Sequence, residues 1–208
     1  MRNLLLLLLL LSFSICANTQ TIRHGVIVGV SDSWLNRSGY PGGGGFGYGE
    51  QYGIVDGKWK ARISFNAGYQ LQFDIKEKYV LDAALLFQSR GVHVFYMPSN
   101  ISTVDETKRL NSIALNGVFN YRIWKGVKAG LGIEPTYYWK TGYWTNQKKT
   151  VFDVPLVAKV GYDFKVMEIS LSYKHGINPI VEGVGYTYKA KSRDIQLSVF
   201  MPLGKLGL

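Results

Sequence analysis

The sequence predicts an all-β protein, folded as an eight-stranded antiparallel up-and-down transmembrane β-barrel. Three observations predict this fold class. Eight strand-like stretches are joined by connections that alternate between short and long, apolar and polar residues alternate within the stretches, and the apolar rows end in aromatic residues. Barrels of the outer membrane combine these features, because they have short turns at one rim, long loops at the other and an aromatic girdle at each interface.

The connections between the stretches are of two kinds. Three are tight turns, at Asp74–Lys78, Arg122–Gly126 and Asp163–Met167. Four are long loops, at Trp34–Lys60, Val94–Arg109, Lys140–Val151 and Gly176–Ser192. If the amino terminus begins in the periplasm, all four long loops face the cell exterior.

The amino-terminal residues have the build of a secretory signal peptide. Arg2 supplies a positive charge, Leu4–Leu11 is an unbroken apolar run, and small or polar residues follow up to Ala17. The run is shorter than the ~20 residues that a membrane-spanning helix needs. A lipoprotein anchor on Cys16 is the weaker alternative, because lipid attachment favours a small residue where Ile15 stands. We therefore predict cleavage after Ala17 or within a few residues of it. Residues 1–17 then form the signal peptide, and residues 18–208 form a barrel domain in the outer membrane of a Gram-negative bacterium.

Composition narrows the expected partners. Cleavage there removes the single cysteine, which leaves no disulfide and no thiol chemistry, and removing Arg2 lowers the formal charge from +10 to +9. The basic residues are dispersed, without the compact patch that a nucleic-acid backbone requires, so nucleic acid is not an expected partner. Outer-membrane lipid, whose outer leaflet carries phosphates, is an expected acidic partner. Ordinary solvated lysines explain the charge equally well.

The first three strands show the alternation with different clarity. Ile22–Ser31 is mostly valine and glycine and shows it least. In Ala61–Phe73, no odd position is charged and no even position carries a large apolar residue, so the two faces of the strand differ in chemistry. Tyr79–Arg90 is mixed, because Val80 and Leu86 share a face with charged and amide residues. Those residues are Asp82, Gln88 and Arg90.

The other five strands separate apolar from polar residues more regularly. They are Asn111–Tyr121, Val127–Trp139, Phe152–Phe164, Glu168–His175 and Arg193–Leu203. In each, one face carries aliphatic and aromatic residues, and the other carries serine, amide, glycine or charged residues.

The apolar face is predicted to contact lipid and the polar face to line the lumen. The apolar rows end in aromatic residues, as an interfacial girdle does: Phe73, Tyr79, Tyr121, Tyr137, Trp139, Phe152, Tyr162 and Phe164. A lysine or arginine on the lipid face near the midplane would cost about 2–4 kcal/mol, and the strands avoid it. A soluble lipocalin-like barrel, with the two faces reversed, is the alternative.

The predicted lumen carries charges of both signs in equal number. The cationic residues are Arg62, Arg90, Arg122, Lys128, Lys159 and Lys174, and the anionic residues are Asp82, Glu134, Asp153, Asp163, Glu168 and Asp194. An eight-stranded barrel is only wide enough for its own side chains. Opposite charges in such an interior satisfy one another by pairing. We therefore expect a plugged lumen rather than an aqueous pore.

Several segments resemble the PorT-type outer-membrane β-barrel family. They are Leu85–Gly91 (LLFQSRG), Gly161–Phe164 (GYDF), Ile169–Asn178 (ISLSYKHGIN) and Asp194–Phe200 (DIQLSVF). The resemblance runs from His24 to Leu203 and rests on patterns of strand and turn. It implies an integral outer-membrane protein. The namesake of the family belongs to a protein-secretion apparatus, and the family pattern names no functional residues.

The last strand departs from the usual pattern of such barrels. They commonly end on a lipid-facing aromatic residue, which helps the barrel-insertion machinery to recognise the strand. Here Phe200 is out of phase with the apolar residues, Pro202 interrupts the strand, and Gly204–Leu208 follows it. The barrel-insertion machinery is an expected partner that meets an atypical signal.

No motif predicts a catalytic, cofactor-binding or metal-binding residue. The glycine run Gly39–Gly49 lacks the following helix that a phosphate-binding loop needs. Ser89 and His93 nominally share a face, but four residues along a strand span ~13 Å, and no carboxylate is placed to orient the histidine. His24 and His175 make no metal-ligand spacing with His93. We therefore expect a protein that is not an enzyme.

Two hypotheses on function come from this pattern. The first is an interaction or accessory barrel in an envelope assembly, such as a secretion apparatus, with envelope or secretion proteins as partners. The second is a free-standing structural or transport barrel that contacts lipid or ligands through its loops. In two of those loops aromatic residues stand beside lysines, which suits sugars, lipid phosphates or the membrane rim. A lipid-modifying enzyme that uses Ser89 and His93 is the least favoured alternative.

Overall fold

The computed structural model describes residues 19–38, 62–96, 104–140, 147–149, 151–183 and 189–207. The predicted signal peptide, residues 1–17, and the glycine run, residues 39–49, lie outside these ranges. The regular elements within them are β-strands: β1 (Thr19–Ser38), β2 (Arg62–Ile75), β3 (Tyr79–Tyr96), β4 (Val104–Trp124), β5 (Val127–Ile133), β6 (Thr136–Lys140), β7 (Gln147–Lys149), β8 (Phe152–Asp153), β9 (Leu156–Asp163), β10 (Glu168–Gly183) and β11 (Lys189–Gly207). No helix in the described ranges is long and apolar enough to cross a membrane.

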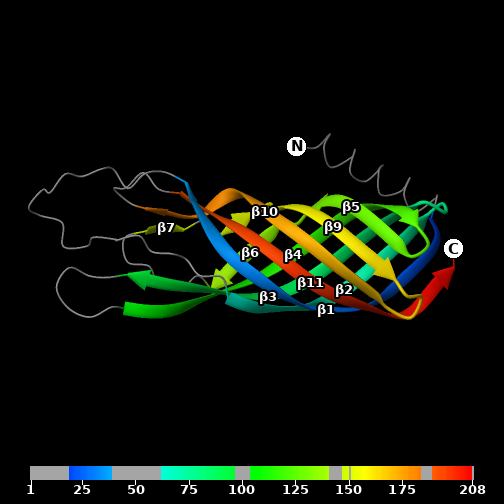
Figure 1. Ribbon diagram of the computed structural model, residues 1–208, viewed down its shortest axis with the longest axis horizontal. Coiled ribbons are helices and arrows are strands. Elements are labelled where there is room, and N and C mark those ends of the chain that lie inside the picture. Colours follow the sequence, from blue (N-terminus) through cyan, green and yellow to red (C-terminus); the bar gives the residue numbers. More distant parts are fainter. Residues whose placement is uncertain are drawn as a thin grey trace, which may run out of the picture.

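The strands form one closed antiparallel sheet that wraps around a single axis (Figure 1). β5 and β6 run one after the other along β4, and β8 and β9 run along β6 and β5. Each of these two pairs therefore takes the place of a single strand, and we call each of the eight strand positions around the barrel a stave. β7 pairs with the far end of β10. The first and last strands, β1 and β11, pair along almost their whole length and close the barrel. The predicted up-and-down barrel is confirmed, and closure leaves no free sheet edge within the membrane.

The three predicted tight turns are confirmed and lie at one end of the barrel (Figure 1). At the other end the strands run farther than the sequence predicted. β3 and β4 stay paired as far as Tyr96 and Val104, and β10 continues to Gly183. The loops predicted at Val94–Arg109 and Gly176–Ser192 were therefore too long. The reason is that backbone hydrogen bonds extend a hairpin without needing alternating apolar side chains.

Two predicted strands are each divided at a proline. Val127–Trp139 contains a break at Glu134–Pro135, and Phe152–Phe164 contains one at Val154–Pro155. Proline has no N–H to donate to a neighbouring strand. Its carbonyl still accepts: Leu115 N donates to Pro135 O at 2.9 Å, and Glu134 N donates to Pro155 O at 2.9 Å. The wall therefore stays hydrogen-bonded across both breaks.

The barrel is apolar outside and polar inside. Leu131 and Phe65 are 73% and 66% exposed on the outer wall, whereas Glu134 and Asp82 are 0% and 1% exposed in the lumen. Most of the predicted girdle is also exposed on the outer wall: Tyr79, Tyr121, Tyr137, Trp139, Phe152, Tyr162 and Phe164. The soluble-barrel alternative is wrong, because it places the charges outside. An outer wall of this kind suits hydrocarbon, where an unpaired charge is costly.

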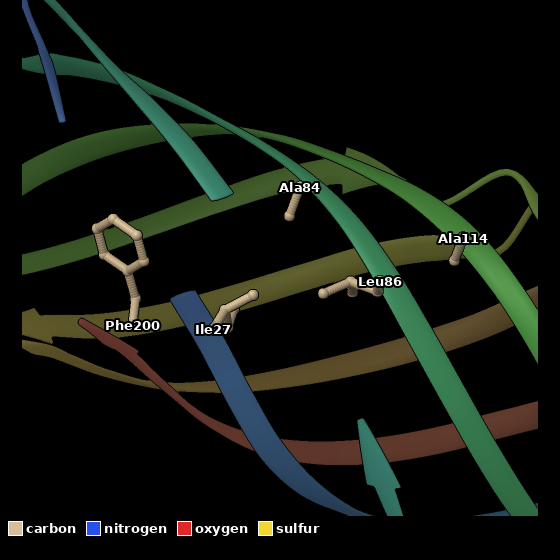
Figure 2. Close-up of a cluster of buried hydrophobic side chains, with 5 residues drawn as sticks. All are labelled: Ile27, Ala84, Leu86, Ala114 and Phe200. Carbon is tan, nitrogen blue, oxygen red and sulfur yellow. The ribbon is translucent and has the colours of Figure 1, made fainter. Parts of the chain in front are cut away.

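Phe200 points into the lumen, as its phase in the strand predicted. It lies in an apolar cluster with Ile27 of β1, Ala84 and Leu86 of β3 and Ala114 of β4 (Figure 2). All five side chains are at most 5% exposed. Leu86, which seemed misplaced on the polar face of Tyr79–Arg90, therefore belongs to an apolar layer inside the barrel. Val80 on the same face is fully buried as well.

Candidate functional site

The lumen gathers the charged side chains that the sequence predicted there. Nine of them are buried: Asp82, Arg90, Lys128, Glu134, Asp153, Lys159, Glu168, Lys174 and Asp194. Arg122 and Asp163 are partly exposed, at the turn end of the barrel. The side chain of Arg62 lies outside the described residues.

A charge quartet occupies the turn-side half of the lumen. It consists of Asp82, Lys128, Lys159 and Glu168, contributed by β3, β5, β9 and β10. The Lys128 ammonium lies 3.0 Å from the Asp82 carboxylate and 2.7 Å from that of Glu168. The Lys159 ammonium lies 2.7 Å and 2.9 Å from the same two groups. Each lysine thus contacts both carboxylates, and the quartet has no net formal charge.

A glutamine joins the two acids of the quartet. Gln72 Nε2 donates to Asp82 Oδ1 and to Glu168 Oε2, each at 2.8 Å. Asn120 Nδ2 donates to Asp82 Oδ2 at 3.0 Å. These amides use carboxylate lone pairs that the lysines leave free, and a buried ionic group needs such bonds to offset its desolvation.

An upper network fills the loop-side half of the lumen and centres on Glu134. Its carboxylate lies 2.6 Å from the Lys174 ammonium and 3.3 Å from the Arg90 guanidinium. Gln88 Nε2 and Asn116 Nδ2 donate to it at 2.9 Å and 2.8 Å. The proline break after Glu134 sets this residue where four inward side chains converge.

Arg90 extends the upper network towards the loops. Its guanidinium donates to Tyr138 Oη at 3.0 Å and lies 3.5 Å from the Asp194 carboxylate. Ser33 Oγ donates to Asp194 at 2.9 Å, and Lys174 Nζ donates to Gln196 Oε1 at 2.6 Å. The upper network therefore relies on neutral partners as much as on opposite charges.

The apolar layer around Phe200 lies between the quartet and the upper network. Along β3 the inward side chains follow the order Asp82, Ala84, Leu86, Gln88 and Arg90. The first belongs to the quartet, the next two to the apolar layer and the last two to the upper network. Ionic and apolar layers thus alternate along the axis of the barrel.

Asp153 was expected to pair with a cation, but it forms no ion pair with another described residue. Its carboxylate accepts hydrogen bonds from Asn178 N at 2.9 Å, Val154 N at 2.8 Å and Ser192 Oγ at 3.1 Å. The break at Val154–Pro155 leaves β10 without a regular partner at this level, and the Asp153 side chain replaces the missing sheet bonds. The Asp153 carboxylate therefore connects β8 to β10 and β11 across the break.

An ionic rim closes the turn end of the lumen and includes a residue that sequence reasoning missed. The Arg23 guanidinium lies 2.6 Å from the Asp163 carboxylate and 3.8 Å from that of Asp74, which also pairs with Arg122. Arg23 was missed because Ile22–Ser31 showed little alternation. The usable signal was its phase, since Arg23 shares a face with Ser31 rather than with the valines.

The remaining residues considered for catalysis or metal binding do not lie together in one site. Ser89 Oγ donates to Asn111 Oδ1 at 3.0 Å on the strand beside it, while the His93 side chain lies outside the described residues. The imidazole of His24 is hydrogen-bonded to Tyr69 Oη at 2.6 Å, and that of His175 lies 3.4 Å from Tyr173 Oη. Among the described residues, no group of three or more histidine, cysteine or acidic side chains is placed to hold a metal ion.

The closed antiparallel sheet, its apolar outer wall and its charged interior define the chain as a small eight-stranded outer-membrane β-barrel. No family model matches the sequence, and no curated protein matches it. The resemblance to the PorT-type family therefore stays a prediction.

The similarity to solved structures lies in the fold. The outer-membrane protein OprG of Pseudomonas aeruginosa aligns with a TM-score of 0.53 and 14% identity, over 90% of this chain and 95% of that one. Neisserial surface protein A aligns with a TM-score of 0.48 and 13% identity, over 86% and 97% of the two chains. Ail of Yersinia pestis aligns with a TM-score of 0.43 and 12% identity, over 90% and 99%.

Proposed function

We propose that this barrel is an interaction or accessory component of an envelope assembly, and that it acts through its outer surfaces rather than through its lumen. The observation that carries the proposal is the layered interior. Quartet, apolar layer and upper network follow one another along the axis, and their side chains are almost wholly buried. A solute would have to part buried ion pairs at two levels, and each buried charge that loses its partner is strongly unfavourable.

The resemblance to the PorT-type family agrees with this proposal and suggests a protein-secretion apparatus as the assembly. An accessory barrel in such an assembly offers its wall and its turns to partners. The outer wall and the turns carry strongly exposed apolar residues, among them Leu131 at 73% and Val166 at 75%. Such residues face either lipid or a partner protein. A cross-linker placed on them captures a protein only in the second case.

The experiment is site-specific photo-cross-linking in intact envelopes. A photoreactive amino acid replaces Leu131 on the wall in one strain and Val166 at a turn in another, followed by extraction in mild detergent and mass spectrometry. We expect the same envelope or secretion proteins in repeated captures from at least one site. Unirradiated cells and an unrelated barrel labelled on its wall serve as controls. Capture of lipid alone at both positions would contradict the proposal.

A second function is favoured by the paired extension of β3 and β4. These strands remain hydrogen-bonded to Tyr96 and Val104, beyond the residues that were predicted to end them. A free-standing barrel that contacts lipid or ligands through its loops would use such an extension. Shortening this hairpin by equal numbers of residues on both strands separates the two functions. Loss of surface binding with unchanged co-purification would favour the loop-based function.

We also propose that the protein has no lipid-modifying activity. The Ser89 hydroxyl donates a hydrogen bond to Asn111, and no carboxylate of the described residues is hydrogen-bonded to it. Replacing Ser89 with Ala should leave the mass spectrum of outer-membrane lipid unchanged relative to the wild type. A lipid species that disappears in this variant and in His93→Ala would contradict the proposal.

A further inference from the structure

The turn end of the barrel carries cationic side chains that no described acid neutralises. Arg23 and Arg122 are paired with Asp74 and Asp163 in the ionic rim. Outside that rim, the turns and the end of β11 carry five exposed lysines and one exposed acid, Glu77. The lysines are Lys76, Lys78, Lys125, Lys165 and Lys205. None of the five forms an ion pair with a described residue, so this lysine collar is free to bind an anion.

The lysine collar surrounds the whole rim instead of forming a patch on one side. Lys76 and Lys78 lie in the β2–β3 turn, Lys125 lies in the β4–β5 turn, Lys165 lies in the β9–β10 turn, and Lys205 lies near the end of β11. The order of neighbours around the barrel is β1, β2, β3, β4, β5, β9, β10 and β11. A lysine therefore stands near every second junction of staves, at the end where the turns gather in Figure 1.

Two of these lysines occupy backbone positions that favour glycine, which indicates that the lysine side chain has a role there. Lys76 and Lys165 have φ angles of 57° and 70°, in the left-handed region that favours glycine. The β4–β5 turn meets the same demand with Gly126, at φ 79°. Two of the three turns thus keep a lysine where glycine would be less strained.

Exposed apolar and aromatic residues show the depth at which the collar lies. Trp124 and Val166, directly beside Lys125 and Lys165, are 74% and 75% exposed. Behind them stands the turn-side part of the girdle, in which the ring centroids of Tyr79 and Tyr121 are 5.6 Å apart. Aromatic residues of this kind lie at the boundary between hydrocarbon and head groups, and a lysine just beyond them reaches the phosphates.

We propose that the lysine collar binds anionic phospholipid head groups of the periplasmic leaflet. Short turns of such barrels face the periplasm, so the collar meets that leaflet. A leaflet is an anionic surface that encircles the barrel, and a charge distribution that also encircles the barrel matches it. An acidic protein docked on one side would leave most of the lysines unused. The inference is independent of the partner in the proposed assembly.

The test compares lipids at the collar by fluorescence. Trp34, Trp59, Trp139 and Trp144 are replaced with Phe, which leaves Trp124 as the reporter, and the barrel is reconstituted in phosphatidylcholine vesicles. Brominated phosphatidylglycerol or brominated phosphatidylcholine then quenches Trp124 on contact. We expect about fivefold preferential association of the anionic lipid, since a lysine near the surface contributes about that factor. The preference should shrink as salt rises.

Charge variants give the matched comparison. Lys76→Gln, Lys78→Gln, Lys125→Gln, Lys165→Gln and Lys205→Gln combined should remove the preference, and the five lysine-to-arginine changes should keep it. Glu77→Gln should raise it. If the two brominated lipids quench Trp124 equally at low salt while all collar lysines are present, the proposal is overturned. Cross-linking of the collar lysines to a single acidic protein, with no anionic lipid retained in native mass spectrometry, would overturn it as well.

Discussion

The two ionic regions of the lumen differ in how their charges are satisfied. In the quartet, two lysines and two carboxylates make four contacts of 2.7 to 3.0 Å, so that each charge contacts both opposite charges of the group. In the upper network, Arg90 meets its two acids at 3.3 and 3.5 Å and also donates to Tyr138. Both groups close the lumen, but we expect them to respond differently when one residue is lost. The balanced quartet should be destabilised more than the upper network, in which neutral partners remain.

The largest effect is expected from removing one cation of the quartet. In Lys159→Met, Lys128 alone faces two buried carboxylates, and leaving a buried charge uncompensated costs about 3–5 kcal/mol of unfolding free energy. Urea unfolding of the barrel in lipid vesicles measures the change. Lys165→Met is the matched control, because its side chain is exposed and forms no ion pair with a described residue. In vesicles of phosphatidylcholine alone, which offer this residue no anionic lipid, its unfolding free energy should stay close to that of the wild type. A quartet variant as stable as this control would contradict the account.

The quartet should also show strong coupling between its members. Asp82→Asn combined with Lys159→Met leaves the Lys128–Glu168 pair, at 2.7 Å, in balance. We expect the double variant to lose about 2–3 kcal/mol less than the two single losses added together. A double-mutant cycle with the same unfolding assay measures this coupling. Simple additivity would mean that the quartet does not act as a unit.

A smaller effect is expected in the upper network. Asp194→Asn removes a charge that lies 3.5 Å from Arg90, while Glu134 and Tyr138 still engage the guanidinium. A hydrogen bond to a charged group contributes about 1.5–3 kcal/mol, and the remaining partners should keep the loss near the lower value. If this variant loses as much stability as Lys159→Met, the contrast between the two regions is wrong.

The smallest effect comes from a hydrogen bond outside the lumen, which calibrates the others. Tyr69→Phe removes the bond between the tyrosine hydroxyl and the His24 imidazole, at 2.6 Å on the outer wall. A single neutral hydrogen bond contributes about 0.5–1.5 kcal/mol. The same urea titration should show a loss within that range. A loss above that of Asp194→Asn would show that the assay does not rank lumen and wall contacts as proposed.

The sequence predicted the fold and most of the charged residues that line the lumen, but it did not predict which of these residues contact one another. Strand period and turn spacing identify the faces, because side-chain direction depends on position alone; even Phe200 followed its phase inward. Alternation does not tell which inward residues meet across the barrel. Gln72 contacts Glu168, 96 positions away, because of the stagger between strands, which only the register fixes.

Two further features depend on contacts between strands, which the sequence pattern does not show. Pro135 and Pro155 each stand inside a predicted strand, and only the geometry of the neighbouring staves shows that both breaks fall side by side. Asp153 was expected to pair with a cation because it is an inward acid. It instead bonds to the backbone at Val154 and Asn178, since the break freed those donors.

The central claim, that ionic and apolar layers close the lumen, is tested most directly by single-channel recording. The purified barrel is inserted into a planar lipid bilayer in concentrated potassium chloride, and the current is followed across a range of voltages. We predict no steps above the background of the bare bilayer. Reproducible ohmic steps from the folded wild-type barrel would contradict the claim and would favour a transport function.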